Sequence, residues 1–340
     1  MKIQWRGRLH WAPLDIESVN TGSAGSHLNS HSAVYLVEID ALRKQFGSVL
    51  AVNDVTVRIP KGGVFGLLGP NGSGKTTLIG LILGLIKPTA GSIQLFGKDV
   101  RGMHLAALRR IGALVESPAF YPDLSGRANL RFFQGIGRRT EDSGEVDRLL
   151  HLVGLAGRAE SKFRTYSLGM KQRLGIAYAL LGNPELVFLD EPTNGLDPAG
   201  MVEVRELIGQ LGKAGHTVVI SSHLMNEVEQ LCDHVAILSR GVLLAQGRVR
   251  DLLSRQDSVR LKTTDDVRAG KILDALDWVA SLRVEAGYLV LDCPAERSGE
   301  LTRELSRNEI FVTEMMPCRQ SLESYFLAVT GNEAAQVKES

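Results

Sequence analysis

Several segments of the chain carry the hydrophobic pattern of half-exposed β-strands. In residues 34–46 and 52–60, apolar and polar side chains alternate. A period of two is typical of a strand with one buried and one solvated face, so we expect antiparallel strands here. Residues 235–247 indicate a further β-hairpin, which turns at Arg240 and Gly241.

Other hydrophobic runs are continuous instead of alternating. Residues 64–69, 186–191 and 217–223 are apolar and end in small or polar residues. Such runs suit parallel strands that are buried on both faces. Helical patterns at 76–86 and 199–211 lie between these runs. The pattern therefore predicts an α/β fold built on a mostly parallel sheet.

The pattern changes from residue 248 onward to short units of strand and helix. This regularity predicts a small α+β domain at 248–340 after a larger domain at 36–247. The expected strands are 258–262, 288–292 and 309–315, and the expected helices are 269–276, 299–307 and 321–329.

Residues 1–35 differ from both domains. They become rich in Ser, Gly, Asn and His and have no apolar core of the kind found in a secretory signal. We expect a disordered leader or a misassigned start codon, and a targeting or partner-binding arm is the alternative.

The composition excludes several function classes. The 340 residues carry 39 basic and 38 acidic side chains, so no overall field attracts nucleic acid or an anionic membrane, and we expect no nucleic-acid partner. The longest apolar run, 78–86, is far shorter than the roughly 20 residues of a membrane helix. Cys232, Cys293 and Cys318 lack CxxC spacing, which argues against a zinc site or a disulfide framework.

The segment GPNGSGKTT has the pattern of a phosphate-binding loop between a strand and a helix. Its glycines let backbone N–H groups and the helix N-terminus point at an anion. Lys75 is expected to reach the β- and γ-phosphates, and Thr76 to offer its hydroxyl to Mg²⁺. A glycine-rich turn without a ligand is the alternative. The expected binding residues are Gly69, Pro70, Asn71, Gly72, Ser73, Gly74, Lys75, Thr76 and Thr77.

LVFLDEP supplies the acidic half of such a site. Asp190 ends a buried strand and is expected to hold magnesium, directly or through water. Glu191 follows it and is expected to polarise the attacking water as general base. Two adjacent acids that cap a helix would be the alternative.

Four motifs in order resemble those of the ATP-binding cassette (ABC) ATPases. TYSLGMKQRL at 165–174 resembles the signature, LVFLDEPTNGLDP the second acidic motif with its Asp-containing loop, and SSHLMNEVEQLCD the histidine segment. The order matches across residues 36–247. The resemblance implies the P-loop NTPase ABC core, with an antiparallel β-subdomain, a helical signature subdomain and ATPase activity.

The resemblance also implies a head-to-tail homodimer in which each ATP lies between two subunits. Ser167 and Gly169 would meet the γ-phosphate across the interface, at a helix N-terminus. His223 would contact the γ-phosphate and hold the attacking water, and Asp197 would link the two sites. Phe46 would stack on adenine. A satisfied structural histidine and a core phenylalanine are the alternatives for His223 and Phe46.

Two positions depart from the usual family pattern. Leu168 replaces one of two central signature glycines, which alters the backbone approach to phosphate. Glu116 stands where the family has glutamine, in a loop that senses the γ-phosphate and Mg²⁺. Glutamate keeps an oxygen ligand, loses an N–H donor and adds negative charge. We expect Glu116 to act beside Thr76 and Asp190 as a metal ligand and catalytic residue. A solvated loop glutamate is the alternative.

Three short features narrow the resemblance to one branch. Glu116, the SLGM signature and the closing segment 321–331 are similar to ATPases of bacitracin and lantibiotic resistance and of related drug and peptide exporters. These pair two copies of an ATPase chain with a separate permease. Phe120 and Tyr121 would then face the permease. Packing against the protein's own helical subdomain competes with that role.

The implied function is the ATP-binding subunit of an ABC exporter of an antibiotic, peptide or other amphipathic compound. It would use ATP and Mg²⁺ at the cytoplasmic face of the bacterial inner membrane, bound through the permease. A soluble ABC ATPase without transport is the alternative, although the chain has neither a second cassette nor a long coiled coil. A module that binds nucleotide without hydrolysis is a third reading. The closing helix could fold back on the core or stabilise the dimer.

Overall fold

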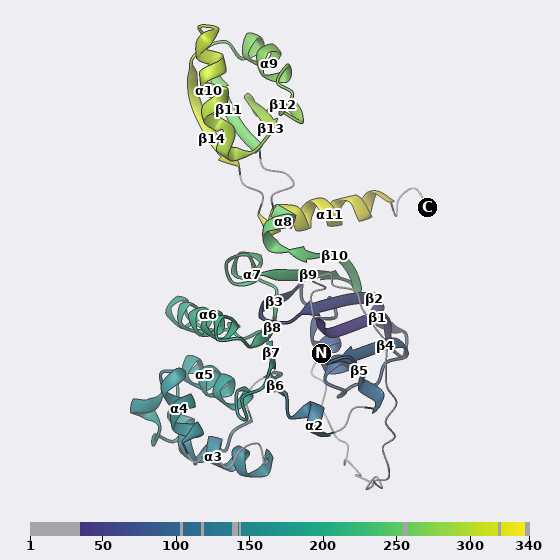
Figure 1. Ribbon diagram of the computed structural model, residues 1–340, viewed down its shortest axis with the longest axis vertical. Helices are drawn as coiled ribbons and strands as arrows, with labels where there is room; N and C mark the ends of the chain where they lie inside the picture. Colours follow the sequence, from purple (N-terminus) through teal and green to yellow (C-terminus); the bar gives the residue numbers. More distant parts are fainter. Residues whose placement is uncertain are drawn as a thin grey trace, which may run out of the picture. The chain divides into compact units, whose positions relative to one another are not determined.

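The computed structural model describes residues 35–102, 105–116, 119–137, 142, 144–253, 258–318 and 321–336. The expectations for residues 1–34 lie outside the described residues. Figure 1 gives the course of the chain and the labels of its elements.

A four-stranded antiparallel sheet follows the alternating segments, as predicted. Its order is β2-β1-β4-β5. On β2, Val55, Val57 and Ile59 are buried and Arg58 between them is exposed. The bounds of the strands are β1 (Tyr35–Phe46), β2 (Val49–Pro60), β4 (Ala90–Leu95) and β5 (Lys98–Asp99).

The predicted parallel sheet forms the centre of the larger domain. Its order is β10-β9-β3-β8-β7-β6, parallel throughout except for the hairpin of β9 and β10. The predicted hairpin turn is correct, since Arg240 and Gly241 both have positive φ, as a tight two-residue turn requires. The strands are β3 (Gly63–Leu68), β6 (Ile111–Leu114), β7 (Leu186–Asp190), β8 (Thr217–Ser222), β9 (His234–Ser239) and β10 (Val242–Arg248).

The two faces of this sheet meet two hydrophobic clusters. Val187 and Leu189 of β7 join a cluster with the large helices, whereas Leu186 and Phe188 join a cluster with α1 and the antiparallel sheet. Figure 1 shows α5, α6 and α7 along one side of the sheet. Because both faces are covered, the central strands are apolar at consecutive positions.

The two helices that the hydrophobic pattern predicts in the larger domain are present, and one of them ends early. The helix expected at 76–86 ends at Ile82, because Gly84 has a φ of 70° and ends it in a left-handed cap. The helices are α1 (Lys75–Ile82), α2 (Leu105–Leu108), α3 (Gly126–Gly137), α4 (Glu145–Leu152), α5 (Leu168–Ala179), α6 (Pro198–Lys213), α7 (Met225–Leu231) and α8 (Val249–Leu253).

The predicted α+β region forms its own sheet and its own hydrophobic cluster. The element order βαββαβ and the antiparallel strand order β12-β13-β11-β14 are those of the ferredoxin-like fold. β12 was missed by the sequence pattern because this edge strand is mostly exposed. The elements are β11 (Ser258–Thr263), α9 (Asp266–Asp274), β12 (Ser281–Glu285), β13 (Tyr288–Asp292), α10 (Ser298–Arg307) and β14 (Val312–Cys318).

The last helix, α11 (Leu322–Gln336), packs on the larger domain. Leu322 is fully buried in the cluster of the large helices, and Tyr325 and Phe326 pack against that cluster. The backbone N–H of Leu322 donates to Oε2 of Glu229 on α7, at 3.0 Å. The expectation that this helix folds back on the core is therefore confirmed, while a role in dimerisation stays a prediction.

Candidate nucleotide-binding and hydrolysis site

The predicted phosphate loop connects β3 to α1 and depends on its glycines. Gly72 and Gly74 have φ values of 81° and 104°, which L side chains rarely adopt. A Cβ atom at Gly69 would lie 2.2 Å from the carbonyl oxygen of Leu238, and one at Gly74 would lie 2.5 Å from that of Ala51. The loop is therefore a close-packed backbone cradle that only these glycines permit.

Lys75 lies inside this cradle, 5% exposed. Its Nζ donates to the carbonyl oxygens of Gly69 at 2.8 Å and Pro70 at 3.3 Å. Ser73 is also buried, and its Oγ has no partner among the described residues. A buried ammonium group and an unpartnered hydroxyl at a helix start fit an anionic ligand. Pro70, Asn71, Gly72 and Thr76 are exposed, and Thr77 is half-buried.

Asp190 meets the loop from β7. Its Oδ2 accepts a hydrogen bond from the hydroxyl of Thr76 at 2.9 Å, and its Oδ1 accepts one from Ser221. Ser221 also accepts from the backbone N–H of Glu191, at 2.8 Å. Sequence reasoning missed Ser221, although a serine at the end of an apolar strand beside an acidic strand was a usable signal. The structure thus brings together the hydroxyl and the carboxylate that were predicted as metal ligands.

Glu191 lies between the side chains of Lys75 and His223, which were both predicted to contact the γ-phosphate. Its Oε1 is 3.3 Å from Nζ of Lys75, and its Oε2 is 2.8 Å from Nδ1 of His223. An ionised carboxylate only accepts hydrogen bonds, so Nδ1 of His223 carries a proton in this contact. This contact places His223 beside the acidic pair, and its role at the γ-phosphate stays a prediction.

The comparisons with known proteins agree with this geometry. The family model described as ABC transporter matches residues 52–194. The bacitracin transport ATP-binding protein BcrA of Enterococcus faecalis is 36% identical over 299 residues, which are 87% of this chain and 97% of that protein. The chain belongs to the ATP-binding proteins of ABC transporters.

A second relative and a solved structure are also similar to this ABC protein. The lantibiotic transport ATP-binding protein SrtF of Streptococcus pyogenes is 39% identical over 62% of this chain and 90% of its own length. A solved dimeric, post-hydrolysis state of an ATP-binding cassette, bound to ADP and phosphate, has a TM-score of 0.56 at 26% identity and covers 63% of this chain and 99% of its own. The chain is therefore an ATPase that binds ATP.

The signature of this ABC protein begins α5 on an exposed surface. Ser167 caps the helix, since its Oγ accepts from the N–H of Met170 at 3.2 Å. Leu168, in place of the usual glycine, is 53% exposed. Asp197 caps α6 in the same way, with Oδ1 accepting from the N–H of Gly200. The contacts of Ser167 and Asp197 within the described residues are these local caps.

Glu116 follows β6, the neighbour of β7 in the sheet, so it lies at the same strand ends as Asp190. It is exposed and has a φ of 64°, an unusual conformation for glutamate. Parallel strands place their carboxyl ends at one edge, where ligands bind in α/β sheets. Its metal role stays a prediction.

Phe46 lies at the end of β1 and is 47% exposed, so it is not a core residue. The Nζ of Lys44 lies 4.6 Å from its ring centroid. An exposed ring can stack on a flat partner, and the adenine contact of Phe46 stays a prediction.

The two aromatic residues expected at a permease contact behave differently. Phe120 is buried and packs edge-on against Phe163 of the helical region, so the competing expectation is correct for this residue. Tyr121 is 48% exposed and packs on Phe132 of α3. Only Tyr121 remains available as an exposed anchor.

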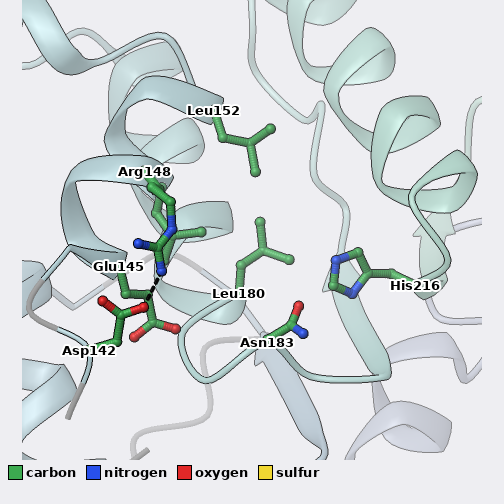
Figure 2. A pocket seen from close by; sticks show the side chains of 8 residues that line it. Asp142, Glu145, Arg148, Leu152, Leu180, Asn183 and His216 are labelled. Carbon is green, nitrogen blue, oxygen red and sulfur yellow. Dashed lines mark hydrogen bonds and ion pairs between the residues drawn. The ribbon is translucent and has the colours of Figure 1, made fainter. Parts of the chain in front are cut away.

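A cavity of about 400 Å³ lies beside α4, away from the predicted site (Figure 2). Glu145 at its wall accepts hydrogen bonds from Gly182 N at 2.7 Å and from Gln134 at 2.8 Å. Nδ1 of His216 on the other side lies 2.7 Å from the carbonyl oxygen of Pro184. These bonds attach the helical region to the sheet, and the cavity contains none of the predicted catalytic residues.

Proposed function

We propose that this chain forms a homodimer that hydrolyses Mg·ATP to drive a separate membrane permease, and that the permease exports an antibiotic, peptide or other amphipathic compound. The site of action would be the cytoplasmic face of the bacterial inner membrane. The alignment with the bacitracin transport protein carries this proposal, because it spans 299 residues and so extends beyond the cassette. The matched relatives do not favour an ABC ATPase without transport.

The permease supplies the membrane attachment in this proposal. Among the residues that the structure describes, no helix is both long and apolar enough to cross a bilayer. A cavity of about 450 Å³ opens between the end of α1, β6 and α3, with Leu85, Leu108, Val115, Phe120 and Tyr178 in its wall. Leu85 is 65% exposed. An apolar hollow of this kind suits a short helix of the permease.

Thr76 and Asp190 fit the magnesium site of this mechanism. Mg²⁺ is commonly bound by one or two carboxylates together with substrate phosphates, and a hydroxyl and a carboxylate lie in contact here. Within the described residues, no group of three or more His, Cys, Asp or Glu side chains could hold a metal by itself. The bound ion would neutralise phosphate charge. Glu116 would add a further oxygen ligand from the neighbouring strand end.

Glu191 would act as the general base and His223 would orient the water and the γ-phosphate. The ion pair with Lys75 holds Glu191 against the phosphate loop at 3.3 Å. When phosphate oxygens engage Lys75, Oε1 of Glu191 becomes free to accept a proton from water. His223 keeps Glu191 oriented through Nδ1 and presents Nε2 to the substrate. The residues of the chain thus hold the base in place before ATP arrives.

Dimerisation would complete the site. At the N-termini of α5 and α6, Ser167 and the cap residue Asp197 are exposed and Gly169 is half-buried. Helix N-termini with free N–H groups bind anions, so α5 of one subunit would cover the γ-phosphate bound by the other. The dimeric cassette bound to ADP and phosphate supports this arrangement.

Co-expression with a multi-span membrane protein, sought first among the products of the adjacent genes, tests the proposal. Copurification of the two proteins and a raised resistance of a sensitive host to bacitracin or a lantibiotic are the expected results. The Glu191→Gln variant should copurify but give no resistance. A failure to copurify would exclude the permease partner. Copurification without resistance would exclude the substrate class.

A further inference from the structure

One buried carboxylate near the site has no role in the mechanism above. Glu227, on α7, is 4% exposed. Its Oε2 accepts a hydrogen bond of 2.7 Å from the hydroxyl of Thr193, which is also buried. Its Oε1 is buried without a partner among the described residues. A carboxylate loses favourable hydration when it is buried, so the burial of Glu227 lowers the stability of the fold.

The bond to Thr193 joins two segments of the hydrolysis site. Thr193 comes two residues after Glu191, in the loop that leads to Asp197. Glu227 comes four residues after His223. The side chains of Glu191 and His223 are themselves in contact, at 2.8 Å. Two side-chain bonds therefore join the same two segments. The contact between Glu191 and His223 lies in the site, and the bond between Thr193 and Glu227 is buried. Together with residues 191–193 and 223–227, these bonds form a closed ring.

α7 is also held from its far side. Glu229 accepts a hydrogen bond from the backbone of Leu322, and Leu322 is fully buried. The bond of 2.7 Å that Gln230 accepts from Arg205 on α6 is exposed to water, which competes for it, so we assign it no part in this support. With α7 supported in this way, the bond from Glu227 transmits the position of the helix to the loop.

We propose that Glu227 is a positioning residue for ATP hydrolysis. It acts through Thr193 to keep the side chains of Glu191 and His223 in contact with each other. The inference rests on the proposed roles of Glu191 and His223. A catalytic group must be held closely, because a misplacement of about 1 Å can cost about 100-fold in rate. Only one oxygen of Glu227 is engaged, so a neutral glutamine can make the same bond to Thr193.

The test uses the full-length chain and separates position from stability. In the Thr193→Val/Glu227→Leu variant both polar partners are removed, which can leave stability nearly unchanged. We expect its kcat to fall at least tenfold, with the Kd for ATP and the urea midpoint of unfolding close to those of the wild type. Glu227→Gln should retain most of the kcat, because its amide oxygen still accepts from Thr193.

Gln230→Ala is the matched control, since it removes an exposed side-chain bond of the same helix and should leave kcat unchanged. A double variant that folds and keeps the wild-type kcat would overturn the proposal. If it fails to fold, Glu227→Gln decides: a kcat as low as that of Glu227→Ala would show that the bond to Thr193 is not what matters. The Glu191→Gln variant is measured alongside, and full turnover there would refute the proposed base and not the inference about Glu227.

Discussion

The two halves of the nucleotide site differ in how far one chain completes them. The phosphate-loop half is interlocked: Lys75, Asp190, Glu191 and His223 are all engaged by other groups of the site. The signature half is exposed, and Ser167 makes only a local cap among its described contacts. The folding of one chain thus assembles the phosphate-loop half, whereas the signature half stays accessible to solvent. In the proposed dimer, a second subunit would therefore supply the signature half, although the acidic residues are already in place.

The largest effect is expected in the phosphate-loop half. Glu191→Gln should lower kcat by about 100- to 10,000-fold, because general-base catalysis contributes in that range. ATP binding should persist, since Lys75 and the backbone cradle remain. Steady-state phosphate release and a nucleotide-binding titration measure the two quantities. Full turnover would remove Glu191 from its assigned role.

The next largest effect is expected in the exposed half. Gly169→Asp places a negative charge at the surface proposed to meet the γ-phosphate of the partner. A Cβ atom at Gly169 has no atom within 4 Å outside the backbone of its own helix, so we expect the single chain to fold and bind ATP normally. We expect ATP-dependent dimerisation, measured by light scattering, to fall at least tenfold.

Gly157→Asp is the control for this prediction, because Gly157 is equally open but lies outside the signature. It should dimerise like the wild type. Equal dimerisation of the Gly169→Asp and wild-type proteins would mean that the signature does not face the second nucleotide.

A smaller effect is expected for Glu116, the predicted metal ligand that follows β6. Glu116→Ala should raise the Mg²⁺ concentration for half-maximal ATPase activity severalfold, because an oxygen ligand is lost while Thr76 and Asp190 remain. Glu116→Gln should shift it less. Asp40→Ala removes an exposed acid on β1 and serves as the control. An unchanged magnesium titration for Glu116→Ala would contradict its metal role.

The smallest effect concerns the local cap of the signature. Ser167→Ala removes the acceptor for Met170 N and should lower the free energy of unfolding by about 1 kcal/mol. Urea denaturation of the nucleotide-free protein measures this. A loss of dimerisation much greater than the loss of stability would show that Ser167 also binds across the interface, whereas unchanged stability would mean that the cap contributes nothing.

Much of the fold could be predicted because the pattern of each strand reflects its burial. The runs at β3, β7 and β8 are apolar at consecutive positions since two hydrophobic clusters cover them. β12 escaped prediction because its side chains are mostly exposed and carry little pattern. The turn at Ala286 and Gly287, both with positive φ, was the remaining signal for that hairpin.

The candidate site was predictable where motifs are local and not where contacts are distant. The glycines of the phosphate loop, Lys75 and the acidic pair are encoded in short segments, because backbone geometry and strand ends are local properties. Ser221 and Thr193 were missed, since their roles depend on partners about 30 residues or more away along the chain.

The sequence by itself thus determined the family, the positions of the buried strands β3, β7 and β8 and the chemistry of the phosphate loop. Only the tertiary structure decided that Phe120 is buried, that Tyr121 is exposed, and that α11 packs on α7. It also revealed the ring that joins Glu191, His223 and Glu227. The reason is physical: burial and side-chain pairing depend on which segments meet in space, and a local pattern does not specify those meetings.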